Sequence, residues 1–169
     1  MRTPQFLQSM YQFVFTDKKM SWLWLIVRVY VGWQWLLAGY EKIINPAWVG
    51  DSTGAAIIGF VKGALEKTGG LHPDVSMWYA GFLKGAVLPY ATTWSYAITY
   101  GELLIGLGLV VGLFTSLAAF FGLFMNLNFL FAGTISTNPQ LLVLALFVML
   151  AHKIAGFIGL DYYRLRKNR

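Results

Sequence analysis

A single carboxylate lies in the middle of a long apolar segment of this sequence. Glu102 is near the centre of residues 90–114, in the run Tyr100-Gly101-Glu102-Leu103-Leu104-Ile105-Gly106-Leu107-Gly108. A carboxyl group held among apolar helices is costly, so it usually faces a polar partner, and such groups often relay protons. The nearby glycines would let a second helix approach closely. We therefore expect Glu102 to face other helices and to act as a catalytic, proton-transferring group. Alternatively, it is protonated and only forms hydrogen bonds between helices.

The best candidate for the partner of Glu102 is Arg28, the only other charged residue placed well inside an apolar segment. Arg28 lies about two helical turns into residues 22–44. We predict that the guanidinium pairs with Glu102 and fixes the charge state of the carboxyl group. Alternatively, the long side chain of Arg28 reaches back to the lipid headgroups.

Two polar residues in later apolar segments can join this pair. Asn126 is near the middle of one segment, and His152 is toward the end of the next. We predict that Arg28, Glu102, Asn126 and His152 converge in one cavity. The simpler interpretations are that Asn126 forms a hydrogen bond between helices and that His152, beside Lys153, lies at the membrane surface.

The remaining candidate residues suit an organic ligand rather than a metal ion. Trp33, together with Trp35, offers a flat surface on which a quinone ring can stack, although most of the aromatic residues suit membrane interfaces. Lys42 and Lys84 would meet an anionic substrate near the outer surface. The sequence has no metal-ligand spacing, no phosphate-binding glycine loop and no nucleophile–base motif, so we expect no metal site. It also has no cysteine, which excludes disulfides and thiol chemistry within this chain.

The composition is typical of an integral membrane protein. The chain of 169 residues suits one domain, 1–169. It is 57% hydrophobic and 12% charged, against about 25% charged residues in soluble domains. The net charge of +6 comes from basic residues that gather toward the two ends. That distribution is a topology signal and does not point to nucleic acid, so the expected partner is the lipid bilayer.

Four membrane spans are predicted, at residues 22–44, 90–114, 116–132 and 140–159. The uncharged stretch after Glu102 would reach about 75 Å as one helix, more than twice the thickness of the hydrocarbon core, so it must turn. The glycine-containing segments 112–116 and 133–139 are the expected breaks. An even number of spans and basic ends place both termini in the cytoplasm of a prokaryotic cell, with the multi-pass chain in the cytoplasmic membrane.

The long loop 45–89 is then extracytoplasmic, and it contains two short amphipathic helical patterns. One runs from Ala55 to Lys67 and ends at glycines, and the other begins near His72 and is stopped by Pro89. Near the N-terminus, apolar residues fall on one face of another helical pattern within residues 1–20. This is either a short helix on the membrane surface or a loosely ordered tail. The predicted fold is therefore an all-α, four-helix membrane bundle with two amphipathic helices between its first two spans.

Three patches of the sequence form a recognisable set. They are Arg28-Val29-Tyr30-Val31-Gly32-Trp33 with Gly39-Tyr40-Glu41-Lys42 and Pro46-Ala47-Trp48; Tyr100-Gly101-Glu102-Leu103-Leu104-Ile105-Gly106-Leu107-Gly108-Leu109 with Gly112-Leu113-Phe114-Thr115; and Asn126-Leu127-Asn128-Phe129-Leu130-Phe131-Ala132-Gly133. Together they resemble the DoxX/DoxD family of small bacterial and archaeal membrane proteins. The long loop is closer to the DoxD-like branch. The resemblance implies a four-helix membrane bundle and a link to quinone-coupled redox chemistry, because the DoxD-type protein is a subunit of thiosulfate:quinone oxidoreductase. Arg28, Lys42 and Glu102 match the family's polar positions.

Three functions are consistent with these features. The first is the membrane subunit of a quinone-linked oxidoreductase that acts on thiosulfate or a related small reduced compound, with a second subunit or a further copy of the chain as partner. The second is a non-enzymatic membrane module that docks or stabilises another protein. The third is a carrier of a small solute or lipid, which would require oligomerisation because four helices form only a narrow pore.

Overall fold

The computed structural model of the chain describes residues 5–167, which contain helices and turns and no strand. The α-helices are α1 Gln5–Thr16, α2 Ser21–Ile43, α3 Ala55–Glu66, α4 Met77–Phe82, α5 Ala91–Val111, α6 Thr115–Phe131, α7 Asn138–Leu150 and α8 Leu160–Lys167. Short helices of other types lie at Lys18–Met20, Leu83–Val87 and Leu88–Tyr90. The predicted all-α class is therefore confirmed.

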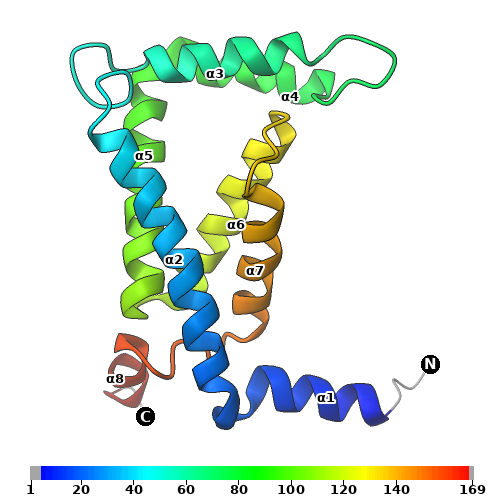
Figure 1. Cartoon of the computed structure of the whole chain (residues 1–169), viewed down its shortest axis with the longest axis vertical. Coiled ribbons are helices and arrows are strands. Elements are labelled where there is room, and N and C mark those ends of the chain that lie inside the picture. The colour runs from blue at the N-terminus through cyan, green and yellow to red at the C-terminus, as the bar shows by residue number, and fades with distance from the viewer. Residues whose placement is uncertain (1–4, 168–169) are drawn as a thin grey trace.

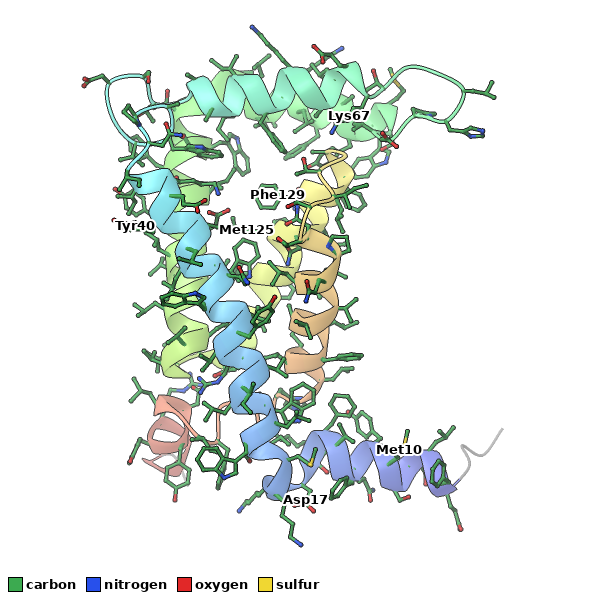
Figure 2. The ribbon with its side chains drawn as sticks, in the orientation of Figure 1. Met10, Asp17, Tyr40, Lys67, Met125 and Phe129 are labelled. Atoms are coloured by element: carbon green, nitrogen blue, oxygen red, sulfur yellow. The ribbon has the colours of Figure 1, made fainter. Side chains whose placement is uncertain are left out.

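Four long helices run along the molecule and shorter helices close both of its ends. Figure 1 shows α2, α5, α6 and α7 along the long axis, with α3 and α4 across one end and α1 and α8 at the other. The most extensive contacts join α2 with α5 and α6 with α7. Met125 and Phe129 extend from α6 toward α5 and α3 (Figure 2), where Phe129 meets the edge of Phe60 at 6.1 Å between ring centroids.

The starts of the predicted apolar helices agree with the structure within two residues, but the end of the fourth does not. The fourth was expected over 140–159, whereas α7 ends at Leu150 and residues 151–159 form consecutive turns. Continuing the helix would not allow Gly156 and Gly159 to pack where they do, against Asp161 and against the backbone of Gly112. The docking of the following segment therefore ends the helix.

Pro89 was expected to stop the second loop helix, and this prediction is wrong. Pro89 occupies the first turn of the short helix Leu88–Tyr90, where a missing backbone N–H costs nothing. The chain continues through this turn into α5, and the helical stretch Met77–Val111 bends rather than ends. The first loop helix agrees with prediction, as α3 ends at Glu66 just before the glycines. The N-terminal pattern forms a helix, α1, with no buried residue.

Glycines bring the backbones of α2 and α5 together. A Cβ placed on Gly106 would lie 2.6 Å from the backbone nitrogen of Leu36, and one on Gly32 would lie 2.9 Å from the carbonyl oxygen of Gly106. Gly39 packs equally closely on Leu103. Small residues permit this approach, which dispersion forces favour in an apolar medium where the hydrophobic effect between helices is absent. The contact fixes how far α2 is shifted along α5.

Two buried clusters fill the interior. One joins the long helices through side chains that include Val31, Trp35, Leu109, Ala119 and Val148. The other joins α3, α4 and the start of α5 through residues that include Ile57, Val61, Tyr79 and Leu83. Within residues 5–167, the continuous helix Met77–Val111 is the one long and apolar enough to cross a membrane by length and composition, and Thr115–Phe131 and Asn138–Leu150 are shorter apolar helices.

The close contact predicts that two alanine substitutions in α5 have opposite effects. Both Gly106→Ala and Gly101→Ala add helix propensity of about 1 kcal/mol. A Cβ on Gly101 meets nothing nearer than the sulfur of Met125 at 3.7 Å, whereas a Cβ on Gly106 collides with α2. We expect Gly106→Ala to lower the free energy of unfolding by about 1–3 kcal/mol and Gly101→Ala to leave it unchanged or raise it. Unfolding in mixed detergent micelles, followed by circular dichroism, measures the free energy of unfolding of each variant. Equal values for the two variants would contradict the close contact between α2 and α5.

Candidate functional site

The carboxyl group of Glu102 is bound to Lys42. The distance between Lys42 Nζ and Glu102 Oε2 is 2.7 Å. Glu102 is 1% exposed, and the Lys42 side chain is 18% exposed. The prediction that Glu102 faces other helices is confirmed, but the prediction that Arg28 is its partner is wrong. The side chain of Lys42 is the part of this pair that remains partly exposed.

The position of this pair follows from helix geometry. Arg28, Trp35 and Lys42 are spaced by seven residues and so lie on one face of α2, two turns apart. Gly39 packs on Leu103, the neighbour of Glu102, which brings the last turn of α2 level with the middle of α5. The shift of α2 along α5 therefore determines which of the two cations on this face, Arg28 or Lys42, reaches Glu102.

The loop after α2 closes over the ion pair. The ammonium group of Lys42 lies 5.0 Å from the ring centroid of Trp48, a distance that permits a cation–π interaction. Ser95 Oγ, on the buried face of α5, donates a hydrogen bond of 2.7 Å to the carbonyl oxygen of Trp48. This bond fixes the loop to α5 and so keeps the indole beside the ammonium group.

Several buried polar groups near the ion pair have no hydrogen-bond partner among the described residues. They are Thr99 Oγ1, both side-chain polar atoms of Asn126, and Trp35 Nε1. Thr99 lies one turn before Glu102 on the same face of α5. The indole nitrogen of Trp35 packs on Gly122, one turn before Asn126 on α6. Buried donors and acceptors are almost always satisfied in proteins, so an unpaired set of this size indicates a place where a ligand or water binds.

The level of Asn126 matches that of Glu102. Gly101 faces Met125 across the contact between α5 and α6. Gly101 directly precedes Glu102, and Met125 directly precedes Asn126. Asn126 is completely buried. The structure thus brings Asn126 to about the same depth as Glu102, as predicted, with Thr99 and the indole nitrogen of Trp35 each about one helical turn away. We call Lys42, Glu102, Thr99, Asn126 and Trp35 the interior polar cluster.

Arg28 belongs to a second centre at the α8 end of the bundle. Its Nη2 donates a hydrogen bond of 2.8 Å to the carbonyl oxygen of Ile158. The guanidinium lies against Gly112 at the C-terminus of α5, where helix carbonyl groups favour a cation. Asp161 attracts it electrostatically. Arg28 is buried, so the alternative in which it reaches out to headgroups is also wrong.

Asp161 caps α6 from a distant part of the chain. Its two carboxylate oxygens accept hydrogen bonds from the backbone N–H groups of Phe114, at 3.0 Å, and Thr115, at 2.8 Å. Its own backbone N–H donates to the carbonyl oxygen of Gly112 at 2.7 Å. A carboxylate at a helix N-terminus satisfies unpaired N–H groups and interacts favourably with the helix dipole. The segment after α7 is thereby held on the turn between α5 and α6.

His152 and Trp33 do not join the interior polar cluster. His152 is exposed and lines a cleft with Lys153 and Asp161 at the α8 end, so the predicted single cavity with Arg28, Glu102, Asn126 and His152 is wrong. Trp33 is 55% exposed and forms an apolar groove on the outside of α2 with Leu25, Ile26, Val29 and Tyr30. Of the two tryptophans considered, Trp35 is the buried one.

The neighbouring Asn128 has a structural role. Tyr79 of α4 donates from its hydroxyl group to the backbone carbonyl of Asn128 at 2.9 Å and to its side-chain oxygen at 3.1 Å. Burial raises the pKa of Tyr79 to about 12, so the hydroxyl stays protonated and remains a donor. This contact attaches α4 to α6.

Sequence reasoning missed Thr99 and Asp161. Each carried a readable signal: Thr99 is one turn from Glu102, and Asp161 is the one acidic residue that follows Glu102 in the sequence. Among residues 5–167, no three His, Asp or Glu side chains gather so that they could hold a metal ion. The chemistry available to the interior polar cluster is hydrogen bonding and proton transfer.

Comparison with known proteins identifies the family. Comparisons with curated proteins and with solved structures found no match. The model of the DoxX family matches residues 23–135, well over half of the chain, and this match includes every member of the interior polar cluster. This chain therefore belongs to the DoxX family of membrane proteins.

Proposed function

We propose that this protein is the membrane subunit of a quinone-linked oxidoreductase and that the quinone headgroup binds at the interior polar cluster. The observation that carries the proposal is the set of unpartnered buried groups beside a buried ion pair. DoxX family membership supports it, because the family resemblance implies quinone-coupled chemistry. The proposed reductant is thiosulfate or a related small reduced compound, bound by this chain or by a second subunit.

The proposal includes four membrane spans, α2, α5, α6 and α7. By helical rise, α2 and α5 are about 35 and 32 Å long, enough for a hydrocarbon core of about 30 Å, whereas α6 and α7 reach about 26 and 20 Å. Turns 151–159, which include the buried Ile154 and Ala155, extend the path of α7. Basic residues at the α1 and α8 end support a cytoplasmic location for both termini.

The residues of the cluster fit the two carbonyl oxygens of a quinone. Trp35 Nε1, Asn126 Nδ2 and Thr99 Oγ1 are neutral hydrogen-bond donors held in an apolar interior. Neutral donors suit a neutral acceptor, because neither partner has to lose the hydration of a full charge. The quinone supplies the redox chemistry: it accepts two electrons and two protons and becomes a quinol.

Glu102 and Lys42 are placed to handle those protons. Glu102 is buried at the level of the unpartnered donors, and Lys42 connects it to the partly exposed loop side. In the ion pair the transferable proton is on Lys42, which passes it to Glu102 for delivery to the ligand and is then reprotonated from the partly exposed loop side. With thiosulfate as reductant, two ions couple through a new S–S bond and release the two electrons that the quinone takes up.

A non-enzymatic docking module is the second candidate. It is favoured by the contacts of Arg28, which binds the carbonyl of Ile158 and helps to hold the C-terminal segment, and so serves the fold. If Lys42 and Glu102 likewise only stabilise the fold, the protein would bind a partner protein and no quinone.

The proposed topology is testable because the chain has no cysteine of its own. We expect Ser52→Cys, in the exposed loop before α3, to react with a membrane-impermeant maleimide in intact cells. Lys19→Cys, in the exposed segment after α1, should react only in inverted vesicles. Reaction of both from the same side would contradict the placement of the two ends on opposite sides.

Removing the buried, unpartnered amide of Asn126 tests whether this group binds a ligand or only supports the fold. Asn126→Leu replaces an unsatisfied amide with an apolar group of similar size, so we expect unchanged or increased resistance to unfolding. In the same sample, the quinone that co-purifies, measured by mass spectrometry of extracted lipids, should fall at least about tenfold, since the hydrogen bonds of a polar ligand are worth more than 1.4 kcal/mol.

Trp33→Phe on the outer face is the matched control and should retain the quinone. Quinone content that falls with Trp33→Phe and not with Asn126→Leu would move the site to the outer groove. A stoichiometric partner protein without quinone in the unmodified sample would favour the docking module.

Glu102→Gln is expected to keep the quinone and lose turnover. The amide retains the shape and hydrogen bonding of the carboxylic acid but cannot relay a proton, which costs a factor of about 100 to 10,000 in typical proton-transfer catalysis. Quinone reduction by thiosulfate in proteoliposomes measures the rate. Unchanged turnover in a folded variant would remove Glu102 from the mechanism.

A further inference from the structure

A basic cleft of about 600 Å³ lies at the end of the bundle opposite the Lys42–Glu102 pair. The start of α6, the turns after α7, α8 and Lys18 form its walls. Its lining includes the cationic side chains Lys18, Lys153 and Arg164 and the imidazole of His152. The proposed redox reaction uses none of these groups.

The single carboxylate in the lining does not neutralise this cleft. Both oxygens of Asp161 accept backbone hydrogen bonds from the start of α6, and one of them is 3.2 Å from Arg164 Nε. Lys18 and Lys153 have no ion-pair partner among the described residues. The cleft therefore holds an excess of positive charge, which favours an anionic ligand.

Aromatic rings hold two of the cations at the cleft. Lys18 Nζ lies 5.3 Å from the ring centroid of Phe157, and the Arg164 guanidinium lies 4.3 Å from that of Phe114. Cation–π contacts of this kind reduce the freedom of long side chains and fix where their charges lie. The charges are thus positioned around the cleft rather than spread over the surface.

Two features of α6 supply hydrogen-bond donors to the same place. Asp161 satisfies the N–H groups of Phe114, the N-cap, and of Thr115, the first residue of this 17-residue helix, which leaves those of Ser116 and Leu117 without an intrahelical partner. Thr115 lines the cleft and is 2% exposed, and its Oγ1, which lies beside the lining residue Gly156, has no hydrogen-bond partner among the described residues. A helix N-terminus with free donors and a buried unpartnered hydroxyl is suited to the oxygens of a phosphate group.

We propose that this cleft binds the phosphate of an anionic phospholipid headgroup. The lining combines cations with the apolar side chains of Leu117 and Phe157, as expected for a site at the boundary between headgroups and acyl chains. The surface helix α1 lies at the same end of the bundle, with Phe6 and Met10 exposed, and supports this placement (Figure 1). The bound lipid would hold the C-terminal segment against α6.

Native mass spectrometry of the full chain in mild detergent tests the proposal. The protein is titrated with phosphatidylglycerol and, in parallel, with phosphatidylcholine that has the same acyl chains. Phosphatidylglycerol should bind at least about tenfold more tightly, because its phosphate charge is not compensated within the headgroup. Equal binding of the two lipids would overturn the proposal. Inorganic phosphate that binds as tightly as phosphatidylglycerol, and displaces it, would assign the cleft to a free anion instead.

Three variants distinguish specific binding of phosphatidylglycerol in the cleft from a general attraction to the basic surface. Lys18→Gln with Lys153→Gln should weaken binding of phosphatidylglycerol about tenfold or more, as expected for two headgroup-level cations. Lys19→Gln, an exposed neighbour that does not line the cleft, is the matched control and should bind normally. Thr115→Val keeps the side-chain shape and removes the hydroxyl, so it should weaken binding about threefold or more while stability stays equal or rises. Equal losses of phosphatidylglycerol binding in the Lys18/Lys153 double variant and in Lys19→Gln would overturn the proposal, as would unchanged binding in Thr115→Val.

Discussion

The close approach of α2 and α5 is the constraint on which the interior of this protein depends. Gly32, Gly39 and Gly106 let the two backbones touch, and that contact sets the shift of one helix along the other. Only at this shift does Lys42, near the end of α2, reach the buried carboxyl group of Glu102. A larger residue at any of the three positions would separate the helices and leave a carboxyl group among apolar side chains, which is strongly unfavourable.

The same shift separates two charged centres at the two ends of the bundle. Lys42 and Arg28 lie on one face of α2, four turns apart, so they cannot serve one site. Lys42 meets Glu102 toward the α3 end, and Arg28 meets the carbonyl of Ile158 at the α8 end. Lys42 has a carboxylate partner, whereas Arg28 donates one hydrogen bond to a backbone carbonyl. Arg28 also lies beside the C-terminus of α5, where the helix dipole adds to its stabilisation.

Much of the fold could be predicted from the sequence because the signals that decide it are local. Long apolar runs marked the four long helices, and the glycines at the breaks adopt left-handed conformations, with φ of 69° at Gly112 and 70° at Gly133. The end of α7 had no such local signal. Buried contacts of Ile154 and Ala155, and the capping of α6 by Asp161, determine the path of residues 151–159, and these contacts come from distant parts of the chain.

The site could be predicted only in part for the same reason. Glu102 and Asn126 were identified because polar residues are rare in apolar segments, and the structure buries both at one depth. The partner of Glu102 was not identifiable, because Arg28 and Lys42 both suit it in type and helix face. The choice between them depends on the shift between α2 and α5, which the positions of the glycines permit but do not specify. His152 was misplaced because the fourth span was assumed to continue to residue 159.

The balance of charges in the interior bears on which ligand it can hold. Glu102 is paired with Lys42, so the interior polar cluster carries no net charge when both are ionised. The groups that remain unpaired, on Thr99, Asn126 and Trp35, are all neutral. A path for ions needs charges or dipoles that replace hydration along its whole length, whereas these groups lie within about one helical turn of the level of Glu102 and Asn126. A neutral molecule with hydrogen-bond acceptors needs only such a local set of donors, together with a group that delivers protons. This charge balance favours a neutral ligand over a permeating ion, which is consistent with the proposed quinone headgroup.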